Sequence, residues 1–345
     1  MMKKAVFMII VAVLNSAAFA QTKRVIEEEY TGTRCGWCPR GTVGMELVQE
    51  KYGDRVIQVA AHYPPQDGTS MATLSKWSGY ENIMARIVGV PTAFLDRRFD
   101  IDPYHGRNSK GFGAPEMIDQ LLEQKCIADI DVEAKWTDEK YQWVEITSNV
   151  KFYENLNREY RLAYVITADS MYKDDVDWAQ LNYYYNLGDD SSITSDPNLE
   201  PLTHEKKYIK GLKYNHVPVA GAGVELGMEG SLPPSVATTE NYVHRVQLEI
   251  PVFETTETNP HPTVIPKEHL NAIAFILDAK SGYIVNVNKM KIPAPATTGI
   301  NAPSTKEVFP SKTTYAVDGS LRPKAMRGLN IIRMEDGSMR KVWVK

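Results

Sequence analysis

Beyond its first twenty residues the chain lacks any long hydrophobic run, and it has no excess of positive charge. No later uncharged stretch approaches the roughly 20 residues that a membrane-spanning helix needs, so we expect the mature chain to be soluble or only peripherally attached to a membrane. A formal net charge of −4 over 345 residues gives no basic surface for phosphate, which argues against nucleic-acid binding. Apolar residues at 43 % and charged residues at 24 % are typical of a globular protein.

Cysteine is also scarce, with Cys35, Cys38 and Cys126 present. Zinc takes four ligands, and His62, the histidine nearest to the close pair in sequence, has no second ligand beside it. We therefore predict no metal and no cofactor. If Cys35 pairs with Cys38, Cys126 is left over, and its apolar neighbour Ile127 indicates a buried, inert thiol.

The first twenty residues are typical of a cleavable secretory signal. Lys3 and Lys4 precede an apolar run at 5–14, and small residues at 18–20 precede Gln21. A run of about ten residues is too short for a membrane anchor. We predict a signal peptide at 1–20 and export to the periplasm, outer membrane or cell surface, where thiols meet an oxidising environment.

Two domains are predicted from a change in hydrophobic periodicity, giving an α/β fold followed by an all-β fold. Residues 127–292 alternate apolar and polar positions, beginning at Ile130, which favours a β-sandwich. Residues 21–126 instead alternate short apolar strands with helical stretches, an α/β pattern. The elements expected there are strands at 25–30, 56–61 and 92–96, and helices at 35–52, 71–88 and 114–124.

The β-sandwich is expected to carry a long, irregular insertion at 168–241, rich in Tyr and Asp, which we interpret as a packed elaboration. A linker rich in Pro, Ala, Thr and Ser is predicted at 293–312. It leads into a basic C-terminal tail at 313–345 with two hairpin signals.

The pair Cys35 and Cys38 carries the chemistry that the sequence suggests. The pair follows an expected strand and opens an expected helix, and its spacing brings both sulfurs within one helical turn. The helix dipole and the neighbouring cation of Arg34 both favour a thiolate at Cys35, which lowers a thiol pKa by about 1 to 5 units in sites of this class. We predict Cys35 as the nucleophile, Cys38 as the resolving thiol and Arg34 as a residue that tunes the Cys35 pKa.

Two features elsewhere support a redox site. Pro91 directly precedes an apolar strand, where a cis Val90–Pro91 peptide would suit a place at which another backbone approaches. Glu29 lies on the strand that leads to Cys35, and a buried acid with a raised pKa could take the proton of Cys38. The alternatives are an inert structural disulfide, a simple strand-starting turn at Pro91, and a solvated carboxylate at Glu29 within the acidic run 27–29.

This order of strand, Cys-x-x-Cys and proline loop resembles the thioredoxin superfamily. The resemblance implies a thioredoxin-like fold for residues 21–126, with Glu29 in the place of the acid that precedes the first cysteine of thioredoxins. Arg34 stands where Trp is usual, and Gly36-Trp37 stands where Gly-Pro is usual. These departures leave the reduction potential open.

A longer similarity covers most of the mature chain. Segments 28–32, 35–41, 271–276 and 285–286 resemble the twenty-eight-kilodalton outer-membrane protein family of the Bacteroidota, which implies a thioredoxin-like domain followed by a β-sandwich. The tail, notably 328–334 and 341–345, is similar to the closing portion of a type IX secretion sorting domain. That similarity implies display at or beyond the outer membrane.

We therefore predict an exported thiol–disulfide oxidoreductase that exchanges disulfides with extracytoplasmic client proteins, with Trp37, Val90 and Pro91 binding the client. The expected partners are clients with disulfides or thiols, an unidentified redox partner, and the outer membrane or cell surface through peripheral association. The alternative is a non-catalytic surface binding or adhesion protein that uses the thioredoxin-like unit as a scaffold, because a fold does not fix an activity.

Overall fold

The computed structural model describes residues 21–108, 110–256 and 261–295, together with the backbone of four short strands between 313 and 344. The predicted signal peptide and residues 296–312 of the predicted linker lie outside the described residues. The chain divides into one compact unit that ends at Pro295 and a second that begins at Ala296. No helix in the described part of the chain is long and apolar enough to cross a bilayer.

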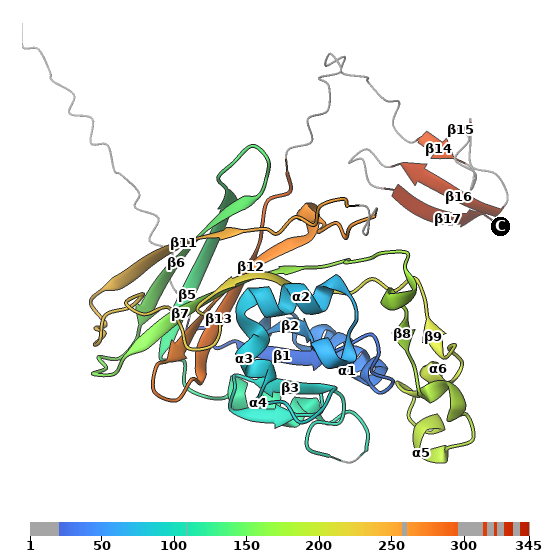
Figure 1. Cartoon of the computed structure of the whole chain (residues 1–345), viewed down its shortest axis with the longest axis horizontal. Coiled ribbons are helices and arrows are strands. Elements are labelled where there is room, and N and C mark those ends of the chain that lie inside the picture. The colour runs from blue at the N-terminus through green and yellow to red at the C-terminus, as the bar shows by residue number, and fades with distance from the viewer. Residues whose placement is uncertain are drawn as a thin grey trace, which may run out of the picture. The chain divides into compact units, whose positions relative to one another are not determined.

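The first unit contains a mixed four-stranded sheet in the order β2-β1-β3-β4 (Figure 1). β1 pairs in parallel with β2 and antiparallel with β3, and β3 pairs antiparallel with β4. All seven residues of β1 are buried, because helices cover one face of the sheet and a second sheet covers the other. The elements are β1 (Val25–Thr31), α1 (Cys38–Tyr52), β2 (Val56–His62), α2 (Ser70–Ser75), α3 (Glu81–Met84), β3 (Thr92–Leu95), β4 (Phe99–Ile101) and α4 (Ala114–Leu122).

The single helix expected at 71–88 is wrong. The chain forms α2, a π-helical turn at Lys76–Tyr80 and then α3, because Gly79 has a φ of 93° that interrupts the helix. A Cβ added to Gly221 would lie 2.2 Å from the Ser78 carbonyl oxygen, so this turn packs closely against a strand of the second sheet. Glycine supplies both the left-handed backbone and the close approach.

Two further antiparallel sheets face each other across the largest apolar core. Their strand orders are β10-β7-β12-β13 and β11-β6-β5. Ala272, Ala274 and Ile276 of β12 belong to this core, whereas Ile273 and Phe275 pack toward the first sheet. β12 is therefore buried on both faces, which accounts for its unbroken apolar sequence. The strands are β5 (Ala128–Trp136), β6 (Trp143–Phe152), β7 (Tyr160–Ala168), β10 (Val217–Ala222), β11 (Asn241–Glu249), β12 (Leu270–Asp278) and β13 (Ile284–Lys291).

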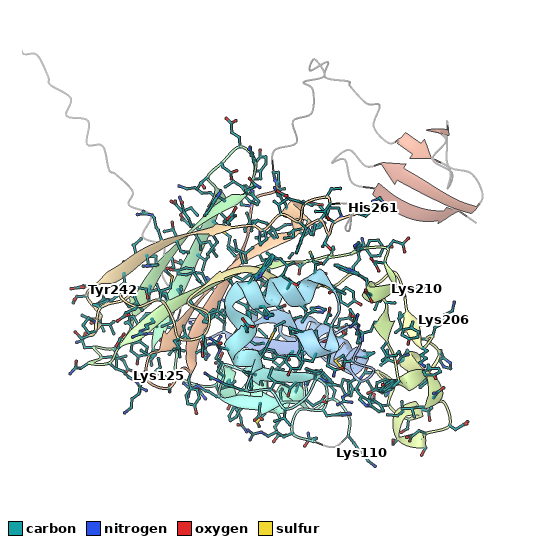
Figure 2. All side chains as sticks on the ribbon, viewed as in Figure 1. Lys110, Lys125, Lys206, Lys210, Tyr242 and His261 are labelled. Atoms are coloured by element: carbon teal, nitrogen blue, oxygen red, sulfur yellow. A yellow bond between two sulfur atoms is a disulfide. The ribbon has the colours of Figure 1, made fainter. Side chains whose placement is uncertain are left out.

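The segment 168–241 is more regular than its sequence predicts. β10 pairs antiparallel with β7, with an irregularity between Pro218 and Ala220. Pro218 and Gly221 are depleted in strands, and an edge position with a bulge tolerates them, so the sequence pattern does not reveal this strand. Residues 180–210 form a small lobe from which Lys206 and Lys210 project outward (Figure 2), whereas Leu232 and Val236 pack into the largest apolar core. The elements of the lobe are β8 (Gln180–Leu181), α5 (Ser191–Thr194), α6 (Glu200–Thr203) and β9 (Tyr208–Ile209).

The second unit contains an antiparallel sheet in the order β15-β14-β16-β17. Its strands lie within the tail predicted at 313–345. They are β14 (Thr313–Tyr315), β15 (Leu321–Arg322), β16 (Gly328–Arg333) and β17 (Met339–Val344).

Candidate active site

The two cysteines lie in the connection between β1 and α1 and form a disulfide, with their Cα atoms 5.4 Å apart. Cys35 is 6 % exposed and Cys38 is fully buried. The helix begins at Cys38 and not at Cys35 as expected, because the residues before it form turns in which the Cys35 N–H donates to Gly32 and the Cys38 N–H donates to Cys35. Cys35 therefore stands just outside the N-terminal end of α1, where the helix dipole favours an anion.

The predicted proline loop meets the disulfide directly. The Val90–Pro91 peptide is cis, which confirms that expectation and replaces a simple strand-starting turn. The Val90 carbonyl oxygen lies 3.5 Å from the Cys35 sulfur, and Pro91 is buried. The structure thus brings together two of the predicted client-binding residues and the predicted nucleophile.

Glu29 is buried below α1, so the alternative of a solvated carboxylate is wrong. It is 2 % exposed, and its Oε1 atom accepts no hydrogen bond from the described residues. A Cβ added to Gly41 would lie 2.2 Å from that oxygen, so the first turn of the helix comes close to the carboxyl only because Gly41 has no side chain. Burial, followed by the charges of Glu27 and Asp102, raises the pKa of Glu29 well above its ordinary value.

The acidic run on β1 is split between the two faces of the sheet. Glu27 faces α1 like Glu29, and its Oε2 atom accepts a hydrogen bond of 2.8 Å from Gln58. Glu28 points to the opposite face and forms two hydrogen bonds with Arg97, of 2.8 and 2.7 Å. Three successive buried carboxylates thus have three different environments.

Glu27 makes the stability of the protein depend on pH. Burial raises its pKa from 4.5 to about 7 against a smaller opposing effect of the Gln58 hydrogen bond. A raised carboxyl pKa means that the folded state binds the proton more tightly, so stability falls as pH rises from the unfolded pKa to the folded one. Between pH 4.5 and 8 this effect lowers the free energy of unfolding by about 3 kcal/mol. We expect Glu27→Gln to remove this loss, as measured by urea unfolding at a series of pH values. An unchanged pH slope in the variant would contradict this assignment.

Arg34 and Trp37 both contact the 168–241 segment. The Arg34 guanidinium lies 3.3 Å from the Asp177 carboxylate, so its charge is shared with that acid and is not directed at Cys35 alone. Trp37 is 41 % exposed, and its ring meets Tyr183 and Tyr184 edge-on at centroid distances of 5.5 and 5.4 Å. The predicted client-binding tryptophan therefore forms part of a partly exposed aromatic cluster.

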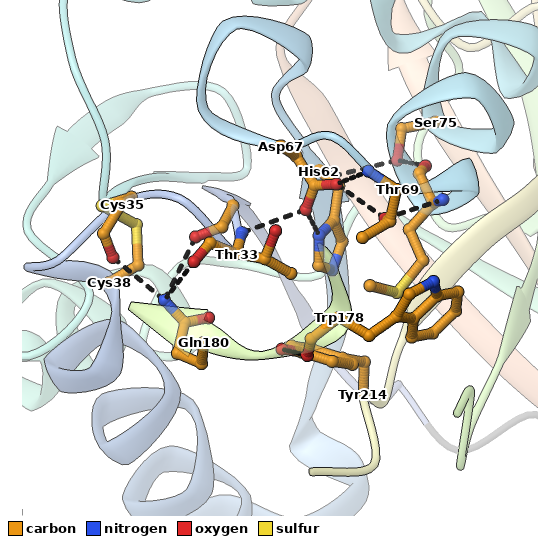
Figure 3. Close-up of polar contacts among 12 residues, drawn as sticks. Thr33, Cys35, Cys38, His62, Asp67, Thr69, Ser75, Trp178, Gln180 and Tyr214 are labelled. Carbon is orange, nitrogen blue, oxygen red and sulfur yellow. Dashed lines mark hydrogen bonds and ion pairs between the residues drawn. A yellow bond between two sulfur atoms is a disulfide. The ribbon is translucent and has the colours of Figure 1, made fainter. Parts of the chain in front are cut away.

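Backbone hydrogen bonds tie the same segment to the disulfide loop. The N–H groups of Leu181 and Tyr183 donate to the carbonyls of Thr33 and Gly36 at 2.7 and 2.9 Å. The side-chain amide nitrogen of Gln180 is buried among the loop carbonyls and lies 2.9 Å from the carbonyl oxygen of Cys35 (Figure 3). The insertion is thus a structural part of the site, which the sequence alone does not reveal because Gln180 lies 145 positions from Cys35.

A buried His62–Asp67 pair supports the loop from the other side (Figure 3). The His62 Nδ1 atom lies 2.5 Å from Asp67 Oδ2, and that oxygen also accepts the Thr33 N–H at 3.0 Å. Burial would raise the pKa of Asp67, but the His62 imidazole and the Thr69 hydrogen bonds outweigh it and lower that pKa. In the sequence His62 stands out only as a possible zinc ligand, and the signal for its structural role is that it is a polar residue at the end of an apolar strand. The described residues contain no cluster of three potential metal ligands.

Comparison with solved structures places these observations in a known architecture. The chain is similar to a structure described as HBP35 of Porphyromonas gingivalis, with 16 % identity over 94 % of this chain and 99 % of that one and a TM-score of 0.50. It has weaker likeness to protein AGR_C_4864 from Agrobacterium tumefaciens, with 14 % identity over 81 % of this chain and 97 % of that chain and a TM-score of 0.40. A domain of the outer membrane lipoprotein Omp28 from P. gingivalis matches at 12 % identity over 48 % of this chain and 88 % of that domain, with a TM-score of 0.23.

The fold likeness therefore rests on the first match, which spans nearly the whole of both chains. No protein-family model matches this chain, and no curated protein matches it in sequence. The mixed α/β sheet and the antiparallel sheets after it agree with an α/β fold followed by a β-rich fold.

Proposed function

We propose that this protein is an exported thiol–disulfide oxidoreductase with a thioredoxin-like domain, acting on the disulfides or thiols of extracytoplasmic client proteins. The observation that carries the proposal is the Cys35–Cys38 disulfide at the start of α1, with the Val90 carbonyl beside one sulfur and the buried acid Glu29 below the same helix. A purely structural disulfide does not explain why a buried carboxyl lies below the same helix.

The exchange proceeds through two displacements when the reduced protein meets a client disulfide. The Cys35 thiolate attacks one client sulfur, so that a bond to Cys35 forms, the client S–S bond breaks and one client thiolate leaves. Cys38 then attacks the Cys35 sulfur, which restores the internal disulfide and releases the second client thiolate. Two electrons pass from the protein dithiol to the client, and the reverse sequence oxidises a client dithiol.

Glu29 is placed to serve the second displacement. Cys38 is fully buried and must lose its proton before it attacks. Glu29 lies below the same helical turn, next to Gly41, and because its pKa is raised its ionised carboxylate is a stronger base than an ordinary one. We propose that Glu29 takes this proton, directly or through solvent.

The client would bind at the rim formed by Trp37, Val90 and Pro91. Val88 is fully exposed and Val90 is partly exposed, so the loop before Pro91 presents both apolar side chains and backbone groups to an extended peptide. Trp37 and Tyr183 extend this apolar rim on the other side of the loop. Backbone pairing at Pro91 would hold the client disulfide near Cys35.

Catalysed reduction of insulin by dithiothreitol tests the activity. We expect the wild-type protein to accelerate the reaction and Cys35→Ser to lower it to the uncatalysed rate, because the remaining thiol of the pair, Cys38, is fully buried. Cys126→Ser is the matched control and should retain full activity, since Cys126 is buried elsewhere. Equal rates with wild-type protein and Cys35→Ser would favour the alternative of a surface binding protein built on an inactive scaffold.

A further inference from the structure

A cavity of about 400 Å³ lies beside α1 and shares Glu29 with the redox site. Neither cysteine lines it. Its inner wall includes the buried residues Glu29, Gln58 and His62, and its mouth carries exposed residues of α1 and of the stretch 212–216 of the insertion. Cavities of this size accommodate small organic molecules.

The inner wall offers hydrogen-bond acceptors that the protein leaves unused. Glu29 Oε1 and Gln58 Oε1 are both buried and accept no hydrogen bond from any described residue. The Gln58 amide nitrogen is already engaged, since it donates to Glu27 at 2.8 Å and lies 2.9 Å from the Met45 carbonyl. Buried acceptors without donors are costly, so these two side chains would gain hydrogen bonds by turning toward an N–H-rich ligand in the cavity.

The charge around the cavity favours a cation. The mouth carries two exposed carboxylates, those of Glu46 and Glu50, and one ammonium group, that of Lys213. Glu27 also lies near Glu29, whereas the nearby Asp102 is paired with Arg40. Among the remaining titratable groups, His62 is paired with Asp67, Tyr214 is a phenol, and burial lowers the pKa of His216, which keeps that ring neutral.

We propose that this cavity binds a small organic cation with N–H donors, an alkylammonium or alkylguanidinium, whose head group pairs with Glu29 and Gln58. The alkyl portion would lie along Met45 and Leu212, which also line the cavity. Binding pairs the ligand cation with the Glu29 carboxylate, and any proton held by that carboxyl leaves to the buffer. Binding of the cation does not depend on the proposed function. Its consequence rests on that function, because a bound cation would hold Glu29 ionised and so control proton transfer from Cys38.

Calorimetric titration of the oxidised full chain with n-butylguanidinium at pH 7 tests the site. Repeating the titration in buffers of different ionisation enthalpy counts the protons released. We expect saturable binding with net release of protons, and binding at least about tenfold weaker for n-butylurea, a neutral molecule of the same shape. Equal binding of the two molecules, or no binding of the cation at millimolar concentration, would overturn the proposal.

Two variants assign the binding to this cavity. Glu29→Gln should abolish proton release and weaken binding at least about tenfold, and Glu46→Lys, an exposed change that should not affect folding, should weaken binding several-fold by charge repulsion. Glu139→Gln, at an exposed site in a distant loop, is the matched control and should bind like the wild type. Full binding by both Glu29→Gln and Glu46→Lys would refute the site. Because the titration involves no turnover, cation binding without insulin reduction would refute only the proposed oxidoreductase function.

Discussion

Replacement of Cys38 by Ala is expected to convert a transient mixed disulfide into a stable covalent complex between Cys35 and its clients. The first displacement needs only the Cys35 thiolate and a client bound at Val90 and Pro91, both of which this variant retains. The second displacement needs the Cys38 sulfur and cannot occur. Non-reducing electrophoresis of the variant after expression with its export signal should show high-molecular-weight adducts that disappear on reduction.

The control for this experiment is the double variant Cys35→Ala with Cys38→Ala. It keeps Cys126, so any adduct that forms through that buried thiol would remain visible. We expect no adducts from the double variant. Complete absence of adducts from Cys38→Ala as well, both in cells and with a model client, would count heavily against disulfide exchange.

Replacement of Arg97 by Ala is expected to produce a large loss of stability. Its side chain is 9 % exposed, and its partner Glu28 is fully buried. Glu28 also accepts a hydrogen bond of 3.1 Å from Tyr80, but this cannot neutralise a carboxylate. Removing one partner of a buried ion pair leaves an uncompensated charge and costs about 3 to 5 kcal/mol.

Urea unfolding at neutral pH measures this effect, and Arg98→Ala is the matched control. Arg98 is exposed and stacks over the Tyr283 ring at 4.8 Å, so its removal should cost well under half as much. The double variant Arg97→Ala with Glu28→Gln should recover part of the loss, because it no longer buries a charge. Similar losses from Arg97→Ala and Arg98→Ala would contradict the role given to the buried pair.

The redox site could be predicted from sequence where its parts are local or carry distinctive chemistry. Cys35 and Cys38 are close in sequence, and the position of Pro91 directly before an apolar strand is a recognisable pattern. Glu29 could be placed because its alternation along β1 sets which face it occupies, although no pattern connects it to Gly41, which comes close to its Oε1 atom.

The parts that escaped prediction all depend on contacts between segments far apart in sequence. Gln180 contacts the carbonyls of the disulfide loop although 145 positions separate it from Cys35. The break at Gly79 likewise arises from its packing against Val224, and local helix propensity cannot report such a neighbour. Asp177, which is also distant in sequence, lies beside Arg34 and changes the electrostatic role expected of that arginine.

The pH dependence of Cys35 alkylation in the reduced protein tests the central claim most directly. Iodoacetamide reacts with the thiolate, so the alkylation rate follows the Cys35 pKa, and a Cys126→Ser background removes the remaining described thiol outside the pair. A position at the tip of α1 predicts a Cys35 pKa at least about one unit below the value near 8.5 of a free thiol. A Cys35 that titrates near 8.5 would contradict the account.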